Sequence, residues 1–409
     1  MPDTVVERLV WLRLRRAALR MRSVAQSGRV GESQRAPSQP SSERVGVQDI
    51  ADALGVSRGT VDRALHNRPG VHPSTRRRVL RAARRLGYQP NLAARYLSSR
   101  KHIRIGLSLP QEVSYFYDDV REGIFEAAST FEPFGVQILH RPYNRFGAHE
   151  LEALRDILEE DIRGLVISPA YPDRLRPYID QAERRGIPVV CVATDAPGSK
   201  RLTSVSVDPF VNGALAGELM AHLVQERRHV AVFIGMHATV DHEQKLEGFR
   251  RSFESFCGRG KIVDVVEAHD ETEEAYEKCR RLLLQKPSVR GIYVSTANSL
   301  PVMRALDELR PGGKIKVIGT DLFPAMVPLL EAGKVAATLY QRPREQGFTA
   351  FRAIVRFLLE GLRPAPQIRL DPAIVMRSNL SLFLQQRPLA NARGSEQPSR
   401  PESPLSAGT

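Results

Sequence analysis

The chain has 409 residues, of which 42% are hydrophobic and 26% charged, so it is long enough for two or three globular domains. No run approaches the ~20 consecutive apolar residues of a membrane span, and the basic N-terminus lacks the apolar core and cleavage site of a secretion signal. Cys191, Cys257 and Cys279 lie far apart without metal-ligand spacing. We therefore expect buried free thiols, a cytoplasmic protein, no membrane partner and no metal or other cofactor.

The net charge of +14 is confined to the first quarter of the chain. Residues 1–44 hold nine Arg against four acids, and residues 45–101 hold twelve Lys and Arg against three acids. Residues 102–409 hold 39 bases and 39 acids, so the rest of the chain is neutral. A neutral body with a basic head is typical of a nucleic-acid binder that has a second, separate function.

Both ends of the chain have the composition of disordered segments. Residues 23–44 are rich in Ser, Gln, Pro and Gly, so we interpret residues 1–44 as a disordered, basic N-terminal extension that could contain one short amphipathic helix. A start codon assigned too far upstream would produce the same pattern. Residues 385–409 are predicted to form a disordered tail, without the leucine heptads of a coiled coil.

The first patterned segment, residues 45–92, predicts a helix-turn-helix domain. A helix over Val47–Leu54 is followed by Gly55, which can adopt the left-handed backbone that ends a helix. Ser57 then stands at the N-cap of a second helix. Two helices joined by such a tight turn place the second in the major groove of DNA.

The second helix is expected to read bases through arginines. Arg58 and Arg63 face outward on it, and each suits the O6 and N7 acceptors of guanine. Gly59 offers no hydrogen bond and lowers helix stability by about 1 kcal/mol relative to Ala. Asp62 would repel phosphates, so we expect it to point sideways. A third, arginine-rich helix is predicted to begin at an N-cap on Ser74.

From residue 102 to residue 384 the pattern alternates between strands and helices. The candidate strands are residues 103–109, 136–140, 164–168, 187–193, 229–235, 261–268, 291–295, 316–320 and 335–341, with helical patterns between them and a last one over 344–360. This alternation predicts an α/β body of parallel sheets with helices on both faces, divided into two lobes. A ligand would bind between the lobes, at the carboxyl ends of the strands.

The head carries a dense motif in the segment VQDIADALGVSRGTVDRALHNRPGVHPSTRRRVLRAARRLGYQPNLAARYL. The matching positions are Asp49, Ala51, Gly55, Val56, Ser57, Thr60, Val61, Arg63, Leu65, Val71, Thr75, Arg76, Val79, Leu86, Gly87, Tyr88, Pro90, Asn91, Ala94 and Leu97. In this register the head resembles the DNA-binding domain of the lactose repressor family. Asp62 and His66 depart from the Ser and Asn that are usual there.

This resemblance implies which residues meet DNA. The implied contacts come from Ser57, Arg58, Gly59, Thr60, Arg63, Asn67, Thr75, Asn91, Ala94 and Leu97. Arg58 and Gly59 fall where the family varies side chains to choose an operator. Residues 93–101 would form a hinge helix that folds when two subunits meet on DNA, with Leu97 wedged into the minor groove. A plain linker is the alternative for this segment.

The body resembles, more loosely, the same family and the related periplasmic sugar-binding proteins. The segments that carry this resemblance are KVIGTDLFPAMVPLLEAGKVAATLYQRPREQG, HEQKLEGF and SYFYDDVREGI. This implies a two-lobed, periplasmic-binding-protein-like domain over residues 102–384 that binds a ligand and dimerises. The matching positions imply ligand contacts from Tyr115, Phe116, Tyr117, Asp195, Lys245, Thr296, Asn298, Asp321 and Gln341.

Two questions about this ligand site stay open in the sequence. Lys245 falls where the family usually has a sugar-binding Arg, so a sugar, a sugar acid and a polyol are all candidate effectors. Asp321 and Asn298 could instead cap helices, and Tyr115 and Phe116 could instead fill the core.

Catalytic motifs are weak in this sequence. It has no Gly-x-x-x-x-Gly-Lys, no Gly-x-Gly-x-x-Gly after a strand and no Gly-x-Ser-x-Gly. The run HEQK at 242–245 lacks the second histidine of a zinc protease, and we interpret it as a chance polar cluster at a helix start.

We therefore predict that the chain is not an enzyme but a ligand-responsive transcriptional repressor. It would bind a pseudo-palindromic operator in double-stranded DNA as a homodimer. A transport-type sugar-binding protein without a DNA role and a sugar-acting enzyme are the alternatives.

Overall fold

The computed structural model describes residues 46–65, 69–86, 102–111, 114–224, 229–258, 260–296, 298–312 and 315–386. The chain divides into two compact units, Met1–Gln89 and Pro90–Thr409. The predicted N-terminal extension, the predicted hinge helix and all but the start of the predicted tail lie outside the described residues. Among the described helices, none is long and apolar enough to cross a bilayer.

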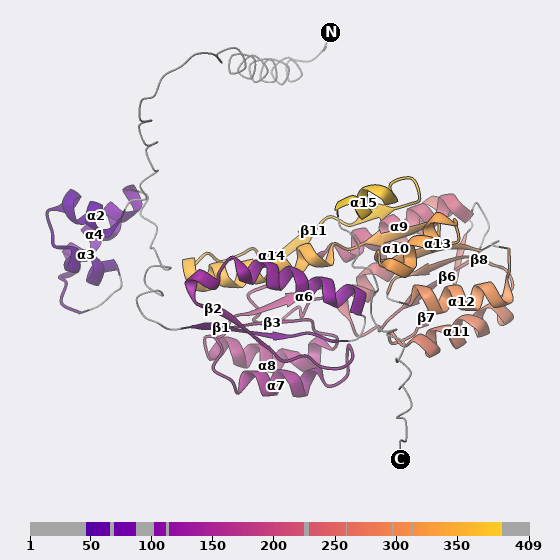
Figure 1. Ribbon diagram of the computed structural model, residues 1–409, viewed down its shortest axis with the longest axis horizontal. Helices are drawn as coiled ribbons and strands as arrows, with labels where there is room; N and C mark the ends of the chain where they lie inside the picture. Colours follow the sequence, from indigo (N-terminus) through magenta and orange to yellow (C-terminus); the bar gives the residue numbers. More distant parts are fainter. Residues whose placement is uncertain are drawn as a thin grey trace, which may run out of the picture. The chain divides into compact units, whose positions relative to one another are not determined.

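The first unit contains a head of three helices, drawn in indigo in Figure 1. They are α2 (Val47–Leu54), α3 (Arg58–Leu65) and α4 (Pro73–Arg85). Their shared core consists of Ile50, Ala51, Val61, Ala64, Val79, Ala82 and Ala83. These small and β-branched side chains recur at helical spacing, so the three helices close around one core as the predicted helix-turn-helix requires.

The helix caps of the head agree with those predicted from the sequence, with one exception. Gly55 has φ 65° and ends α2, and Ser57 Oγ accepts the amide proton three residues on at 3.2 Å. The predicted N-cap at Ser74 is wrong, because α4 begins earlier, at Pro73. Proline is favoured in the first helical position, and His72 Nδ1 accepts the Ser74 amide proton at 3.4 Å.

The second unit contains two six-stranded sheets, each at the centre of one lobe. The first lobe has the strand order β11-β5-β4-β3-β1-β2, all parallel. Its strands are β1 (Ile103–Ser108), β2 (Val136–His140), β3 (Gly164–Ile167), β4 (Val189–Val192), β5 (Thr203–Val207) and β11 (Gln367–Leu370). Helices α6 (Ser114–Ser129) and α14 (Pro343–Glu360) cover one face, and α7 (Glu150–Leu158) and α8 (Pro172–Arg184) cover the other (Figure 1). The short η1 (Glu132–Phe134) precedes β2.

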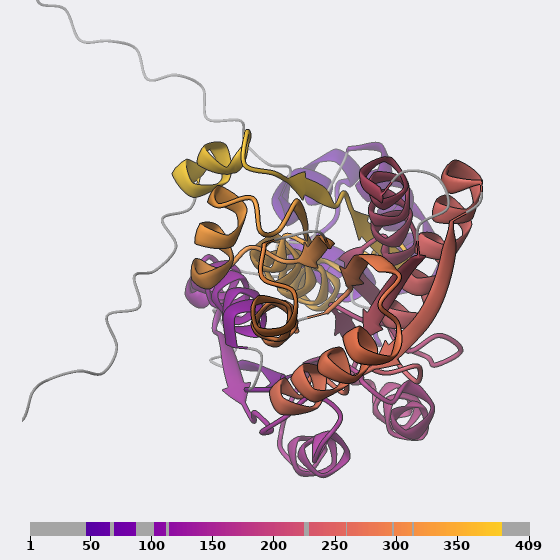
Figure 2. The ribbon, with the colours of Figure 1, turned by 90° about the vertical axis from the view of Figure 1, so that its right-hand side faces the viewer.

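The second lobe has the strand order β12-β10-β9-β8-β6-β7, parallel except for β12. Its strands are β6 (His229–Ile234), β7 (Lys261–Glu267), β8 (Val289–Val294), β9 (Lys316–Thr320), β10 (Ala337–Tyr340) and β12 (Ala373–Val375). Helices α9 (Pro209–Val224) and α10 (Val240–Cys257) pack on one face, and α11 (Thr272–Gln285) and α12 (Ser299–Leu309) on the other (Figure 2). The short η2 (Pro324–Met326), α13 (Val327–Glu331) and α15 (Leu380–Gln386) complete the lobe, and α15 continues two residues past the predicted end of the body.

The continuous apolar runs in the sequence reflect burial on both faces of each sheet. In β6, Val230, Val232 and Ile234 belong to the core beneath α9 and α10. Ala231 and Phe233 point to the opposite face and belong to the core beneath α11 and α12. Because successive side chains of a strand alternate between faces, a strand covered on both sides needs apolar residues at every position.

The chain passes three times between the lobes, after β5, after β10 and after β11. The predicted strands are all present, with ends shifted by a few residues, but β5, β11 and β12 were not predicted. The buried strand β5 alternates Thr and Ser with Val, so it lacks the apolar run that marks the other strands. β11 and β12 are short, and they carry partly exposed side chains at the edges of their sheets.

A glycine contact fixes the spacing of α9 and α10. A Cβ on Gly213 would lie 1.9 Å from the carbonyl oxygen of Lys245, and one on Gly248 would lie 2.0 Å from that of Phe210. Only glycine permits two helix backbones to approach this closely. The position of Lys245 therefore depends on the absence of a side chain at Gly213.

Candidate functional site

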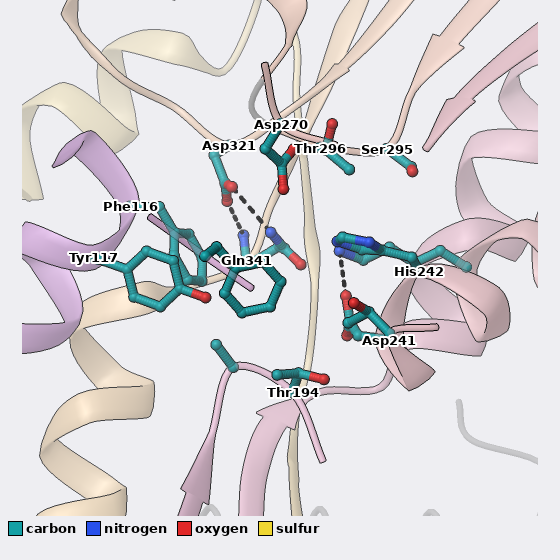
Figure 3. A pocket seen from close by; sticks show the side chains of 14 residues that line it. Phe116, Tyr117, Thr194, Asp241, His242, Asp270, Ser295, Thr296, Asp321 and Gln341 are labelled. Atoms are coloured by element: carbon teal, nitrogen blue, oxygen red, sulfur yellow. Dashed lines mark hydrogen bonds and ion pairs between the residues drawn. The ribbon is translucent and has the colours of Figure 1, made fainter. Parts of the chain in front are cut away.

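A cavity lies between the two lobes, where the carboxyl ends of strands from both sheets meet (Figure 3). Its lining consists of Phe116, Tyr117, Phe146, Ala193, Thr194, Thr239, Asp241, His242, Lys245, Asp270, Ser295, Thr296, Asp321 and Gln341. The loops after β4, β7, β8, β9 and β10 and the first turns of α6 and α10 supply most of these residues. This is the location predicted for a ligand in a two-lobed α/β body.

Aromatic side chains form one side of the cavity (Figure 3). Phe116 and Tyr117 meet edge to face, with ring centroids 5.1 Å apart, and Phe146 lies 6.0 Å from Tyr117. The hydroxyl of Tyr117 is hydrogen-bonded to Ser168 Oγ at 3.0 Å, and burial raises its pKa far above the usual range. This side therefore offers apolar ring surface to a ligand.

Charged side chains of the second lobe form the opposite side. Lys245 Nζ lies 2.6 Å from Asp241 Oδ2, and both side chains are more than nine-tenths buried. Asp321 accepts hydrogen bonds from the side chain of Gln341 at 2.9 Å and from its backbone amide at 3.4 Å. Burial raises the pKa of Asp321 to about 6, although the nearby ammonium of Lys245 opposes the shift.

His242 is held as a neutral hydrogen-bond donor. Its Nδ1 accepts the backbone amide proton of Met236 at 2.9 Å, so the ring proton must reside on Nε2. Burial lowers the pKa of His242, which further favours the uncharged ring.

Several polar atoms that line the cavity have no hydrogen-bond partner among the described residues. They are Thr194 Oγ1, Asp241 Oδ1, Asp270 Oδ1 and Thr296 Oγ1. Thr194, Asp241 and Thr296 are each at most 6% exposed. Buried polar groups are rarely left unsatisfied in a folded protein, so this arrangement indicates a polar ligand that supplies hydrogen bonds here.

The backbone is strained at three of the lining residues. Ala193, Asp270 and Asp321 have φ 69°, 55° and 66°, in the left-handed region that residues other than glycine rarely adopt. Each lies just beyond the end of a strand and faces the cavity. Strain of this kind persists where the surrounding structure holds a side chain in place for function.

The structure brings together six of the predicted ligand residues: Phe116, Tyr117, Lys245, Thr296, Asp321 and Gln341. Tyr115 lies outside the lining and stacks on Phe323 of the second lobe, with ring centroids 4.0 Å apart. Asn298 is buried at the N-cap of α12 but makes no side-chain capping bond, and it too lies outside the lining.

Asp195 does not face the cavity either, so the structure corrects this prediction. Its carboxylate forms a bidentate ion pair with Arg201 and accepts a hydrogen bond from Gln367 Nε2 at 3.1 Å. Burial alone would raise the pKa of Asp195, but the hydrogen bonds and charge of Arg201 outweigh burial and lower it. Asp195 thus ties the loop before β5 to β11.

Eight lining residues were not predicted from the sequence: Phe146, Ala193, Thr194, Thr239, Asp241, His242, Asp270 and Ser295. The interpretation of residues 242–245 as a chance polar cluster is not supported, because His242 and Lys245 both face the cavity. Ala193, Thr194 and Ser295 stand directly after strands, and that position was the available signal for them. No group of His, Cys, Asp and Glu within the described residues has the arrangement of a metal site.

On the head, α3 presents Arg58, Gly59 and Arg63 to solvent. A Cβ on Gly59 would lie 3.6 Å from the guanidinium of Arg63, so that side chain folds back along the helix across Gly59. Thr60 is half-buried, and its hydroxyl lies 2.9 Å from that of Ser57. The missing side chain at Gly59 therefore leaves an open helix surface, and the side chain of Arg63 extends over it.

The other predicted DNA contacts are only partly described. Thr75 is half-buried on α4. Asn67, Asn91, Ala94 and Leu97 lie outside the described residues.

Comparisons with known proteins match both units. Residues 47–91 match the model of bacterial regulatory proteins of the lacI family, and residues 105–361 match the periplasmic binding protein domain. Catabolite control protein A of Priestia megaterium is 24% identical over 310 residues, which are 72% of this chain and 91% of that protein. The ribose operon repressor of Bacillus subtilis is 26% identical over 309 residues, 72% of this chain and 90% of that protein.

Among solved structures, the glucose-galactose binding protein GanP of Geobacillus stearothermophilus shares the fold of the body. It superposes with a TM-score of 0.63 at 23% identity, over 68% of this chain and 99% of that one.

The helix-turn-helix head and the two-lobed body with its polar cavity define a ligand-responsive, DNA-binding transcription regulator. The head is a DNA-binding domain of the lacI family, and the body belongs to the periplasmic binding protein domain family.

Proposed function

We propose that the protein is a repressor that binds its operator as a homodimer. Its affinity for the operator would decrease or increase when a sugar or sugar-like effector occupies the cavity between the lobes. The observation that supports this most directly is the set of buried, unpartnered polar atoms in that cavity. A chain with this cavity and a helix-turn-helix head can couple ligand binding to DNA binding, provided that the ligand prefers one conformation.

The cavity suits a polyhydroxylated ligand. Carboxylate and hydroxyl oxygens of Asp241, Asp270 and Thr296 can accept hydrogen bonds, and Nε2 of His242 can donate one. The rings of Phe116 and Phe146 can pack against the C–H surface of a sugar. Two of the similar proteins are named as repressors or control proteins, and a structure with the same fold is named as a sugar-binding protein.

The head suits an operator with guanines in each half-site. Arg58 and Arg63 are exposed on the same helix, and a bidentate arginine–guanine pair contributes about 1–3 kcal/mol of discrimination. A two-fold dimer would apply this readout twice, to half-sites separated by about one turn of DNA. The transport-type alternative gives no role to this basic head.

Selection of binding sites from a random DNA library tests the proposal, followed by affinity measurements with and without a panel of sugars. We expect a pseudo-palindromic site, weakened and less selective with Arg58→Ala or Arg63→Ala, and an affinity that changes with one effector. Arg251→Ala, at a side chain 70% exposed on α10, is the matched control. Absence of sequence-specific binding by a dimeric preparation would refute the proposal.

A further inference from the structure

The charges that face the cavity do not balance. The lining contains three carboxylates, on Asp241, Asp270 and Asp321, and a single ammonium, on Lys245. His242 adds no charge, because its Nδ1 accepts an amide proton from the backbone. The described lining therefore contains two more carboxyl groups than ammonium groups.

The one ammonium is already engaged. Lys245 Nζ lies 2.6 Å from Asp241, and the two side chains are 3% and 7% exposed. A buried pair at this distance is neutral as a unit, so it offers little net positive charge to an anionic ligand. Because Asp241 Oδ1 has no partner among the described residues, the pair still presents one acceptor to the cavity.

The other two carboxylates form no ion pair among the described residues, although the ammonium of Lys245 lies near enough to Asp321 to oppose the rise in its pKa. Asp321 receives hydrogen bonds from Gln341, a neutral amide whose own oxygen lies 3.4 Å from the side-chain nitrogen of Asn212. Oδ1 of Asp270 is buried and has no partner in the described structure. In Figure 3, Asp270 and Asp321 both appear at the top of the view, and burial and the charges of both carboxylates raise the pKa of Tyr115.

We propose that the effector is a polyhydroxylated amine, of the amino sugar class, whose ammonium binds between Asp270 and Asp321. This inference rests on the proposed function and narrows its ligand. An ammonium supplies both the missing positive charge and donors for the unpartnered oxygen of Asp270. The hydroxyls of the same ligand meet Asp241, Thr194 and Thr296.

Anionic effectors fit this cavity poorly. A sugar acid or a sugar phosphate would bring its charge near two carboxylates, while the ammonium of Lys245 is held by Asp241. Buried like charges without compensation are strongly unfavourable. A neutral sugar can donate hydroxyl protons to Asp270, but a hydrogen bond with one charged partner is weaker than one in which both partners are charged.

Calorimetric titration of the full-length protein with matched ligands tests this inference. The probes are glucose, galactose and mannose, their 2-amino-2-deoxy counterparts, and glucuronate. We expect one amine to bind at least about tenfold more tightly than its neutral counterpart, and glucuronate to bind more weakly than either. Asp270→Asn should weaken binding of the amine more than binding of its neutral counterpart, and so abolish the preference for the amine.

Two further variants keep the experiment decisive. Asp321→Asn removes the second carboxylate and should also reduce the preference if Asp270→Asn fails to fold. Asp307→Asn, at an exposed side chain that pairs with Lys334, is the control and should change neither affinity.

The outcomes separate the inference from the proposed function. A neutral sugar or glucuronate that binds as tightly as any amine overturns the inference and leaves a saccharide-sensing regulator in place. A preference for the amine that survives both Asp270→Asn and Asp321→Asn also overturns it. If no saccharide of any charge binds, the proposed function fails as well.

Discussion

The buried carboxyl of Asp321 should make the stability of the protein depend on pH in an unusual direction. Burial raises its pKa from 3.8 to about 6 in the folded protein, whereas the unfolded chain retains the lower value. Between these two pH values the folded state binds more protons than the unfolded state, so the free energy of unfolding decreases as the pH rises. Most acids in ion pairs show the opposite trend.

The size of the effect follows from the two pKa values. A difference of this size corresponds to about 3 kcal/mol, which is lost as the pH rises from about 4 to about 6 and stays lost at higher pH. Replacing Asp321 with Asn removes the titrating group but retains an oxygen that can accept the Gln341 hydrogen bond. We therefore expect Asp321→Asn to be more stable than the native chain above pH 6, by up to about 3 kcal/mol.

Urea unfolding of both proteins, followed by circular dichroism from pH 4.5 to pH 8, measures this difference. Taking the difference between variant and native chain at each pH removes the contributions of all other titrating groups. Asp307→Asn, at an exposed position, should show no such pH-dependent difference. A difference for Asp321→Asn that is flat with pH would refute the raised pKa.

The remaining predictions concern packing and DNA reading. Lys245→Met should destabilise the body by about 3–5 kcal/mol because it leaves Asp241 buried without its partner, and adding Asp241→Asn should recover much of that loss. Gly213→Ala should cost roughly 2–4 kcal/mol, because its Cβ would meet the Lys245 carbonyl oxygen at 1.9 Å. Gly59→Ala should stabilise the head by about 0.5–1 kcal/mol, because its Cβ makes ordinary contact with Arg63, whereas Gly59→Leu should displace Arg63 and change the preferred DNA sequence.

Thermal unfolding and binding-site selection check these three expectations. A double variant no more stable than Lys245→Met would show that the charge of Asp241 is not the cause of the loss. An unchanged melting temperature in Gly213→Ala would mean that the helices can separate freely. An unchanged DNA preference in Gly59→Leu would contradict the role given to the space above Gly59.

The fold was largely predictable because periodicity and turn chemistry are local. The helix-turn-helix depends on Gly55 and Ser57, whose roles follow from backbone conformation and side-chain chemistry. The parallel sheets followed from apolar runs separated by helical patterns. β5 was not predicted because Thr203 and Ser204 are polar residues that become buried only through tertiary contacts, which no local sequence pattern records.

The cavity was predictable only at positions that the resemblance to the family covers, whether on a helix, as for Lys245, or after a strand. Asp321 and Gln341 stood at such positions after predicted strands, whereas Asp270 followed a predicted strand without one, and Thr194 was passed over for its neighbour Asp195. Asp195 also follows a strand, yet its carboxylate is turned toward Arg201, a choice that the tertiary structure makes. Strand ends thus located the site, but side-chain direction could not be deduced from sequence.

The three passages of the chain between the lobes have a consequence for biosynthesis. The first lobe begins at Ile103, but its helix α14 and its edge strand β11 are made only after nearly all of the second lobe. Until residue 360 leaves the ribosome, one face of the first sheet lacks α14, and until residue 370 leaves it, β5 lacks its neighbour β11. Neither lobe is a continuous stretch of sequence, so a nascent chain that stalls before α14 exposes apolar surface to chaperones and proteases.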